Sequence, residues 1–370
     1  GFDIIPMWVA DMNFPTVPTV QEAMAERIGH PAFGYFSPSD DYFNAIIRWQ
    51  ERRNGVRDLE KKHIGYENGV LGGLLSALNV FCSKGDHVLL NSPTYIGFTK
   101  SLANNGYRAV HSPLYLDEEN VWRMDYEDMD KKLKENHIHL AIFCTPHNPC
   151  GRVWEREEIE KAMEVYEKNK CLVISDEIWS DLTLEGHKHI PTQSVNEYAH
   201  EHTFAFYAPS KTFNLAGLVG SYHIVYNSYL RDRLMEAEKC SHYNSANVLS
   251  ISALMGAYTK EGAEWVDELR EVLTQNVDYA YTYITTHFEG VSVAKAQGTY
   301  MLYLDCSGWL KAHPEMTMDD LIRAGIAVGV VWQDGRPFMN PNTIRMNLAV
   351  PHALVKEAMD RLDKYVFNAK

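Results

Sequence analysis

The chain has 370 residues, of which 45% are hydrophobic and 23% charged, so it has the apolar material for a large core and too little charge for a disordered chain. Forty-nine acidic and 35 basic residues give a formal net charge of −14, and no long basic run interrupts them. We therefore expect no nucleic-acid partner and no membrane partner. The length suggests two or three structural units.

No apolar segment approaches the roughly 20 residues that span a bilayer, and the N-terminus lacks the pattern of a signal peptide. We therefore expect a cytoplasmic protein. The sequence begins at Gly1 rather than at Met, so we expect a short native piece to precede it. The six cysteines form no C-x-x-C pair, which predicts reduced, buried thiols and no metal site.

Short, β-branched-rich runs between about residues 60 and 226 predict strands. They lie at residues 87–91, 108–111, 140–144, 171–175, 203–207 and 221–226. Apolar residues at helical spacing occur between them, at residues 72–81 and 155–169. Strands that alternate with helices predict a mostly parallel sheet with helices on both faces.

After about residue 227 the pattern changes to long helices, predicted at residues 228–240, 246–260 and 263–288. Strands of a second, smaller sheet are predicted at residues 291–296, 299–304, 326–331 and 343–349, and a closing helix at residues 351–366. The sequence contains no internal repeat and no low-complexity linker.

Lys211 lies in a turn rich in Ser and Thr, directly after a predicted buried strand. A partly desolvated amine at the carboxyl end of a sheet has a depressed pKa and can form a Schiff base with an aldehyde cofactor. Taken alone, a lysine in such a turn is more often an ordinary surface residue.

Two further segments place polar groups at strand ends. Asp176 follows the run at residues 171–175, where a carboxylate can protonate and hold a pyridine nitrogen. Asn148 lies between two prolines in the turn after residues 140–144, and the prolines restrict its backbone. Its amide could donate to an oxygen on the same ring.

The order N-P-x-G, then D-E at a strand end, then S-K-T-F resembles the fold type I pyridoxal-phosphate enzymes of the class I/II aminotransferase superfamily. The resemblance covers nearly the whole chain. It implies an α/β fold with a large domain around a mostly parallel, seven-stranded type of sheet and a smaller α+β domain. The implied limits are residues 39–245 for the large domain, and 1–38 with 246–370 for the small one.

The resemblance also implies roles for the three residues above. Lys211 would bind pyridoxal 5'-phosphate covalently, Asp176 would pair with the pyridine nitrogen, and Asn148 would hydrogen-bond the ring hydroxyl. In the same way, Tyr95 would stack on the pyridine ring, although alone it is more often ordinary core.

The cofactor phosphate would lie at the start of a helix. Residues 67–73 open that helix, and the free N–H groups at Gly69, Val70 and Leu71 would hold the phosphate. The glycine cluster alone is a weak signal, because it lacks the G-x-G-x-x-G spacing of dinucleotide-binding proteins.

Arg345 lies in a predicted strand with apolar neighbours, where a guanidinium needs a carboxylate partner. The resemblance implies that this partner is the α-carboxylate of the substrate, with Ala10 and Asn148 also in contact with the substrate. Without the other motifs, an internal salt bridge is the preferred interpretation.

The run I-P-M-W-V-A-D-M-N-F-P at residues 5–15, followed by F-G-Y-F at residues 33–36, resembles the cystathionine β-lyases and cystalysins, a branch of carbon–sulfur lyases. Asn13 stands where this branch carries a second Asp. The branch implies a homodimer in which Tyr35 reaches the cofactor phosphate of the neighbouring subunit.

Two positions depart from the aminotransferase pattern. Trp179 and Val219 stand where transaminases usually carry a Tyr near the cofactor ring and an Arg on the phosphate. Trp179 is still expected beside the cofactor. Since Val219 removes a phosphate charge, Asn148, Ser210, Tyr35 and the helix-start amides must hold the cofactor.

The sequence thus predicts an enzyme that cleaves cystathionine or related cysteine S-conjugates to a thiol, pyruvate and ammonia, with Lys211 as the catalytic base. An aminotransferase is the alternative, because both reactions use the same motif residues. A nucleotide-binding dehydrogenase or a non-enzymatic sheet protein is a distant alternative. The expected partner is a small-molecule amino-acid substrate, whose identity the motifs leave open.

Overall fold

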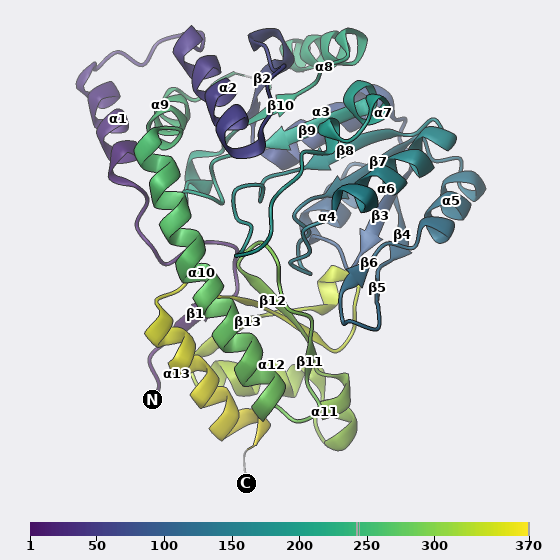
Figure 1. The fold of residues 1–370 in the computed structure, drawn as a ribbon, viewed down its shortest axis with the longest axis vertical. Helices are drawn as coiled ribbons and strands as arrows, with labels where there is room; N and C mark the ends of the chain where they lie inside the picture. The colour runs from purple at the N-terminus through teal and green to yellow at the C-terminus, as the bar shows by residue number, and fades with distance from the viewer. Residues whose placement is uncertain (242, 244, 369–370) are drawn as a thin grey trace.

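The computed structural model describes residues 1–241, 243 and 245–368. A seven-stranded sheet lies at the centre of the larger part of the molecule, and a five-stranded sheet at the centre of the smaller part (Figure 1). The order of the large sheet is β2-β10-β9-β8-β7-β3-β4. Its strands are β2 (Ile64–Asn68), β3 (His87–Ser92), β4 (Arg108–Pro113), β7 (Leu140–Cys144), β8 (Leu172–Asp176), β9 (Thr203–Tyr207) and β10 (Gly220–Ile224).

Most neighbours in the large sheet run parallel, as predicted. β3 pairs in parallel with β4 and β7, and β8 with β7 and β9. β10 is the exception, because it runs antiparallel to both β2 and β9. β2, which is an edge strand of this sheet, was not predicted from the sequence.

Helices cover both faces of the large sheet, because its central strands are apolar on both sides. Leu90 and Ile142 pack toward α3 on one face, whereas Leu89 and Phe143 pack toward α5 and α6 on the other. The helices of this part are α1 (Pro18–Gly29), α2 (Asp40–Asn54), α3 (Val70–Phe81), α4 (Ile96–Asn104), α5 (Tyr126–Glu135), α6 (Arg156–Lys168), α7 (Glu197–His202), α8 (Ser228–Ser241) and α9 (Val248–Ala257).

The small sheet has the order β1-β13-β14-β12-β11 and is antiparallel except for the pairing of β1 with β13. The long helix α10 runs from the side of α9 down to this sheet, where α13 packs against it (Figure 1). The elements are β1 (Ile5–Met7), β11 (Ser292–Val293), β12 (Met301–Asp305), β13 (Val330–Asp334), β14 (Thr343–Asn347), α10 (Lys260–His287), α11 (Ser307–Ala312), α12 (Met318–Ala327) and α13 (His352–Leu362).

The strand predicted at residues 326–331 is partly wrong. α12 continues to Ala327, and the strand starts only at Val330. A capping box at Thr317 starts this helix, and Gly329, with φ +81°, turns the chain after it. Apolar residues on a helix end and on the strand that follows therefore form one run, which periodicity alone does not divide.

The closing helix is also shorter than predicted, because α13 ends at Leu362 and a π-helical turn follows over Asp363–Phe367. A small hairpin, β5 (Tyr115–Leu116) with β6 (Trp122–Arg123), was not predicted.

All six cysteines are free. Cys82 is half-buried and Cys240 is exposed, so the expectation of buried thiols is wrong for these two.

α1 and α9 lie outside the range predicted for the large domain, yet they share a hydrophobic core with β2, β9 and β10. The predicted domain limits stay a prediction.

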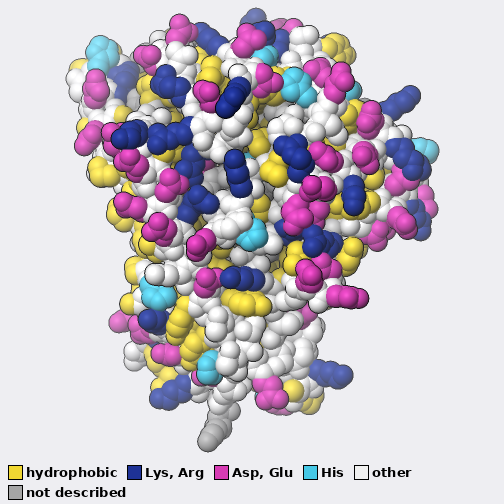
Figure 2. Space-filling view, in the orientation of Figure 1, with side chains coloured by type: hydrophobic (Ala, Val, Ile, Leu, Met, Phe, Trp, Pro, Cys, Tyr) yellow, Lys and Arg dark blue, Asp and Glu magenta, His cyan; other side chains and the backbone are white. Residues whose placement is uncertain are grey.

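On the surface, Lys and Arg are interspersed with Asp and Glu over the face shown in Figure 2. Within residues 1–241, 243 and 245–368, no helix combines the length and the apolar character needed to cross a membrane.

Candidate active site

The predicted site residues follow three strands that end at the same edge of the large sheet. Asp176 is the last residue of β8 and lies opposite Cys144, the last residue of β7. The turn after β7 carries Asn148, and the turn after β9 carries Lys211. Because these strands are parallel, their carboxyl ends meet, and the three side chains line one pocket.

This pocket has a volume of about 290 Å³. It is lined by ten of the predicted residues, namely Ala10, Gly69, Val70, Leu71, Tyr95, Asn148, Asp176, Trp179, Ser210 and Lys211. Six further residues complete the lining: Asn68, Gly72, Cys144, Ile178, Ala216 and Val219. A larger pocket of about 430 Å³ lies elsewhere and contains none of the predicted residues, so we assign the site to the smaller one.

Asp176 is almost fully buried at the pocket, with 4% of its surface exposed. Its Oδ1 accepts a hydrogen bond from the backbone N–H of Ile178 at 3.1 Å. Burial raises the pKa of the carboxyl to about 7, against the opposing effects of this hydrogen bond and of Lys211. At neutral pH the carboxyl can therefore both hold and release a proton.

Lys211 Nζ donates a hydrogen bond to the carbonyl oxygen of Ala10 at 2.8 Å. Burial lowers the pKa of this amine, while Asp11 and Asp176 act in the opposite direction. The hydroxyl of Tyr300 donates to the same carbonyl at 2.9 Å. The Lys211 amine thus shares an acceptor with Tyr300, a fully buried residue that was not predicted from the sequence.

Arg345 does not line the pocket itself but contacts a residue that does. Its Nη1 donates to Asn148 Oδ1 at 3.1 Å, and its Nη2 donates to the carbonyl of Trp8 at 3.1 Å. Its guanidinium lies over the ring of Phe338. Because the Asn148 oxygen is occupied, the amide N–H groups of Asn148 are the donors left for a ligand.

The charge of Arg345 has no acidic partner within 4.0 Å in the part of the chain that the structure describes, although only 4% of the residue is exposed. Its Nε also lacks a hydrogen-bond partner there. Burial lowers the pKa of Arg345 to about 10. The internal salt bridge considered above is therefore absent from the described residues, and the guanidinium is available for an anion.

The start of α3 offers an anion site at the same pocket. Gly69 precedes the helix with φ +87°, a left-handed conformation that favours glycine. No side chain caps the first turn. The uncapped N–H groups and the helix dipole can therefore attract a phosphate.

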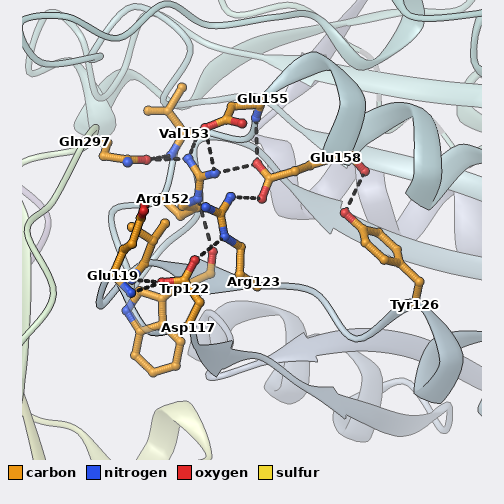
Figure 3. A network of polar contacts seen from close by, with 11 residues as sticks. Asp117, Glu119, Trp122, Arg123, Tyr126, Arg152, Val153, Glu155, Glu158 and Gln297 are labelled. Carbon is orange, nitrogen blue, oxygen red and sulfur yellow. Dashed lines mark hydrogen bonds and ion pairs between the residues drawn. The ribbon is translucent and has the colours of Figure 1, made fainter.

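The turn that carries Asn148 is held by a network around the buried Arg152 (Figure 3). Arg152 Nη2 lies 2.5 Å from Glu158 Oε2, and its Nε donates to the carbonyl of Trp122 at 3.1 Å. Arg152 Nη1 donates to Gln297 Oε1 at 2.5 Å, and Gln297 lies between β11 and β12 of the small sheet. The network thus joins the turn to the smaller part of the molecule.

The N-terminal segment reaches the site after β1, and side chains bind its carbonyls. Asn347 Nδ2 donates to the carbonyls of Val9 and Asp11, both at 2.6 Å. Asn214 Nδ2 donates to the carbonyl of Met12 at 2.9 Å. Neither asparagine was predicted, although Asn214 follows the S-K-T-F motif directly and Asn347 lies two residues after Arg345 on the same strand face.

The remaining predicted residues differ in their surroundings. Trp179 is buried and packs edge-on against Tyr300 with ring centroids 4.8 Å apart. Tyr95 is half-buried at the start of α4. Tyr35 is fully exposed and does not line the pocket, so its role stays a prediction that needs a second chain.

The residues at this pocket fit pyridoxal phosphate. The cofactor's aldehyde needs an amine, its pyridine nitrogen needs a carboxyl group and its phosphate needs an anion site. Lys211, Asp176 and the start of α3 offer these groups at one pocket. The individual roles of the site residues stay predictions.

Comparison with known proteins identifies the family. Residues 3–362 match the family model described as aminotransferase class I and II, so this chain belongs to that family, whose cofactor is pyridoxal phosphate. Cystathionine β-lyase PatB of Bacillus subtilis is 34% identical over 307 residues, which cover 83% of this chain and 79% of PatB. Protein MalY of Escherichia coli is 29% identical over 306 residues, which cover 82% of this chain and 77% of MalY.

Solved structures agree with this result. The pyridoxal-phosphate-bound C–S lyase of Staphylococcus hominis has a TM-score of 0.89 at 29% identity, covering 97% of this chain and 92% of that one. Cystalysin of Treponema denticola, which contains a pyridoxal 5'-phosphate cofactor, has a TM-score of 0.91 at 26% identity, covering 100% and 93%. The predicted family resemblance and the α/β fold are thereby confirmed.

Proposed function

We propose that this chain is a pyridoxal-phosphate-dependent carbon–sulfur β-lyase acting on cystathionine or related cysteine S-conjugates. The observation that carries the lyase assignment is the similarity to a cystathionine β-lyase over 83% of the chain. The geometry that supports an amino-acid substrate is the buried guanidinium of Arg345, which has no acidic partner among the described residues.

Each of the chain's own groups has a part in this reaction. Arg345 would bind the substrate α-carboxylate with both arms of its guanidinium, and the Asn148 amide would keep that guanidinium in place. The Lys211 amine would take the Cα proton, because its lowered pKa leaves more of it unprotonated at neutral pH. Asp176 would hold the proton on the pyridine nitrogen.

Pyridoxal phosphate supplies the electron sink for breaking the Cα–H bond. Loss of the Cα proton and of the Cβ thiolate, followed by addition of water, gives a thiol, pyruvate and ammonia. The half-exposed Trp8 and Val9 lie in the segment that Arg345 and Asn347 bind, so this segment would limit access of water to the site.

The test of this proposal is the product formed without a keto acid. L-cystathionine or an S-alkyl cysteine should yield stoichiometric pyruvate and ammonia, faster than alanine converts the cofactor to its pyridoxamine form. Borohydride reduction followed by peptide mapping should label Lys211. Rapid conversion to the pyridoxamine form with no pyruvate would favour an aminotransferase instead, and a colourless protein with no label would contradict both assignments.

We also propose a homodimer in which Tyr35 reaches the neighbouring site. In the single chain, Phe33, Tyr35 and Phe36 are exposed together on the segment between α1 and α2, which is the kind of apolar surface that a second chain covers. Mixing a Tyr35→Ala chain with a Lys211→Ala chain tests the arrangement. Hybrid dimers should regain activity, because one of their two sites contains both residues. If mixing restores nothing, Tyr35 does not act across subunits.

A further inference from the structure

Asp181 is a buried carboxylate that lies outside the pocket, five residues after Asp176. Its Oδ2 accepts a hydrogen bond from Thr212 Oγ1 at 3.1 Å. Trp49 Nε1 donates to both of its carboxylate oxygens, at 3.2 and 3.3 Å. Arg53 Nε lies 3.6 Å from its Oδ1. One carboxylate thus joins the segment after β8, the turn after β9 and helix α2.

The contact with Thr212 bears on Lys211, because the two residues are adjacent. Thr212 is fully buried, and within the described residues its hydroxyl makes this single hydrogen bond. The next residue, Phe213, is also fully buried and packs against Trp49 and Trp265. The turn is therefore anchored on the side away from the pocket.

Lys211 itself has little else to fix it. Its amine makes one hydrogen bond, to the carbonyl of Ala10. Four methylene groups separate the amine from its Cα, so the position of the turn decides where the amine can reach. The anchored neighbours, rather than contacts of the amine, set that position.

The influence of Asp181 on Lys211 is geometric rather than electrostatic. The charges that act on the Lys211 amine are those of Asp11, Arg345 and Asp176. Asp181 is not among them, and the positive charge of Arg53 lies directly beside it. A change at Asp181 should therefore alter where the amine lies, and leave its pKa close to that of the unaltered protein.

We propose that Asp181 is a positioning residue, which holds the turn of Lys211 against the strand end of Asp176 through its hydrogen bond with Thr212. The proposal rests on the proposed function, because it assumes that Lys211 captures pyridoxal phosphate. Capture joins the amine nitrogen to the aldehyde carbon and releases one water. Its rate depends on placement of the amine, and a displacement of about 1 Å can cost roughly 100-fold.

Four variants separate positioning from stability. Thr212→Val keeps the side-chain shape and removes the hydroxyl, while Thr212→Ser keeps the hydroxyl. Asp181→Asn leaves one acceptor oxygen for the two donors, Thr212 and Trp49. Trp49→Phe is the matched control, because it removes another donor to the same carboxylate and keeps an aromatic ring beside Phe213.

The main measurement is the rate at which apo protein captures pyridoxal phosphate, with the product trapped by borohydride and mapped to Lys211. The pH dependence of that rate and the thermal unfolding of each apo protein are measured as well. Thr212→Val and Asp181→Asn should slow capture by roughly 10- to 100-fold with an unshifted pH profile, and Thr212→Ser should restore it to within about threefold. Trp49→Phe should lower Tm and leave the rate within about threefold.

Capture by Thr212→Val at the rate of the unaltered protein would overturn the proposal. So would a rate that falls in proportion to Tm in all four variants, because that is what a purely structural role predicts. A shifted pH profile would show an electrostatic role instead. If the unaltered protein captures nothing at Lys211, the proposed function fails, and the positioning role fails with it.

Discussion

Replacing Arg345 should remove recognition of the substrate carboxylate. The unaltered side chain is 4% exposed, makes two hydrogen bonds of 3.1 Å to neutral acceptors and has no acidic partner in the described residues. A bound α-carboxylate would therefore supply the close anionic partner that Arg345 lacks among the described residues. Truncating one member of such a buried pair costs about 2–5 kcal/mol. At tenfold per 1.4 kcal/mol, Arg345→Met should lower kcat/KM by about 30- to 4,000-fold.

The assay compares substrates with and without the carboxylate. S-ethyl-L-cysteine and S-ethylcysteamine differ by that group alone, so the cofactor's spectral response to each reports the discrimination directly. Arg345→Met should bind the two with similar affinity. Arg345→Lys should recover part of the difference, because an ammonium keeps the charge and lacks the two-armed geometry. Arg336→Met, at an exposed arginine paired with Asp319 and Asp334, is the matched control.

The reasoning would be refuted by an Arg345→Met protein that still prefers the carboxylate-bearing compound by the original factor. It would also be refuted if Arg336→Met lost the preference to the same extent. Either result would mean that the carboxylate is bound elsewhere.

Three further predictions concern other buried charges. Asp176→Asn should fold and bind cofactor but lose about 100-fold or more in kcat/KM, because an amide cannot hold the pyridinium proton. Burial raises the pKa of Glu67 to about 8 and of Glu238, beside it, to about 9. Protonation of the pair thus stabilises the fold most fully below about pH 4.5, and this contribution is lost as the pH rises to 8–9. Glu238→Gln should therefore flatten the fall in unfolding free energy between about pH 4.5 and 9. Arg152→Leu should lower the unfolding free energy by about 3–5 kcal/mol, whereas Arg156→Leu, at an exposed pair, should change it by less than about 1 kcal/mol.

Urea titrations at several pH values check the two stability predictions, and steady-state kinetics checks the first. An Asp176→Asn enzyme with nearly unchanged kcat/KM would remove Asp176 from the reaction. A Glu238→Gln protein whose stability still falls as steeply with pH would place the titrating groups elsewhere. Equal effects of Arg152→Leu and Arg156→Leu would mean that the buried network contributes no more than a surface ion pair.

The sheet edge that lines the candidate site could be predicted from sequence because its signals are local. Asn148, Asp176 and Lys211 each follow a β-branched apolar run that is long enough to read as a strand. Once the strands are taken as parallel, their carboxyl ends must meet, so the three residues were expected to lie together. The glycine at position 69 before an apolar helix is likewise a local signal.

Other features depended on contacts that local patterns do not contain. The reversed direction of β10 follows from its pairing with both β2 and β9. The division of residues 326–331 between α12 and β13 depends on the pairing of the strand with β1 and β14. In both cases hydrogen bonds between distant segments decide between structures that the same apolar residues permit.

The sequence by itself therefore determined the sheet edge that carries Asn148, Asp176 and Lys211, since strand and turn preferences act over a few residues. Only the tertiary structure decided which partners those residues meet. It left Arg345 without an acidic partner among the described residues, although the chain has forty-nine acidic residues. It also placed Tyr300 and Lys211 on one carbonyl of the N-terminal segment, and joined Asp181 to Thr212. These contacts join residues 31 to 290 positions apart. They form because side chains from both parts of the molecule, such as Asn214 and Asn347, bind the N-terminal segment at the site, an arrangement that no local pattern encodes.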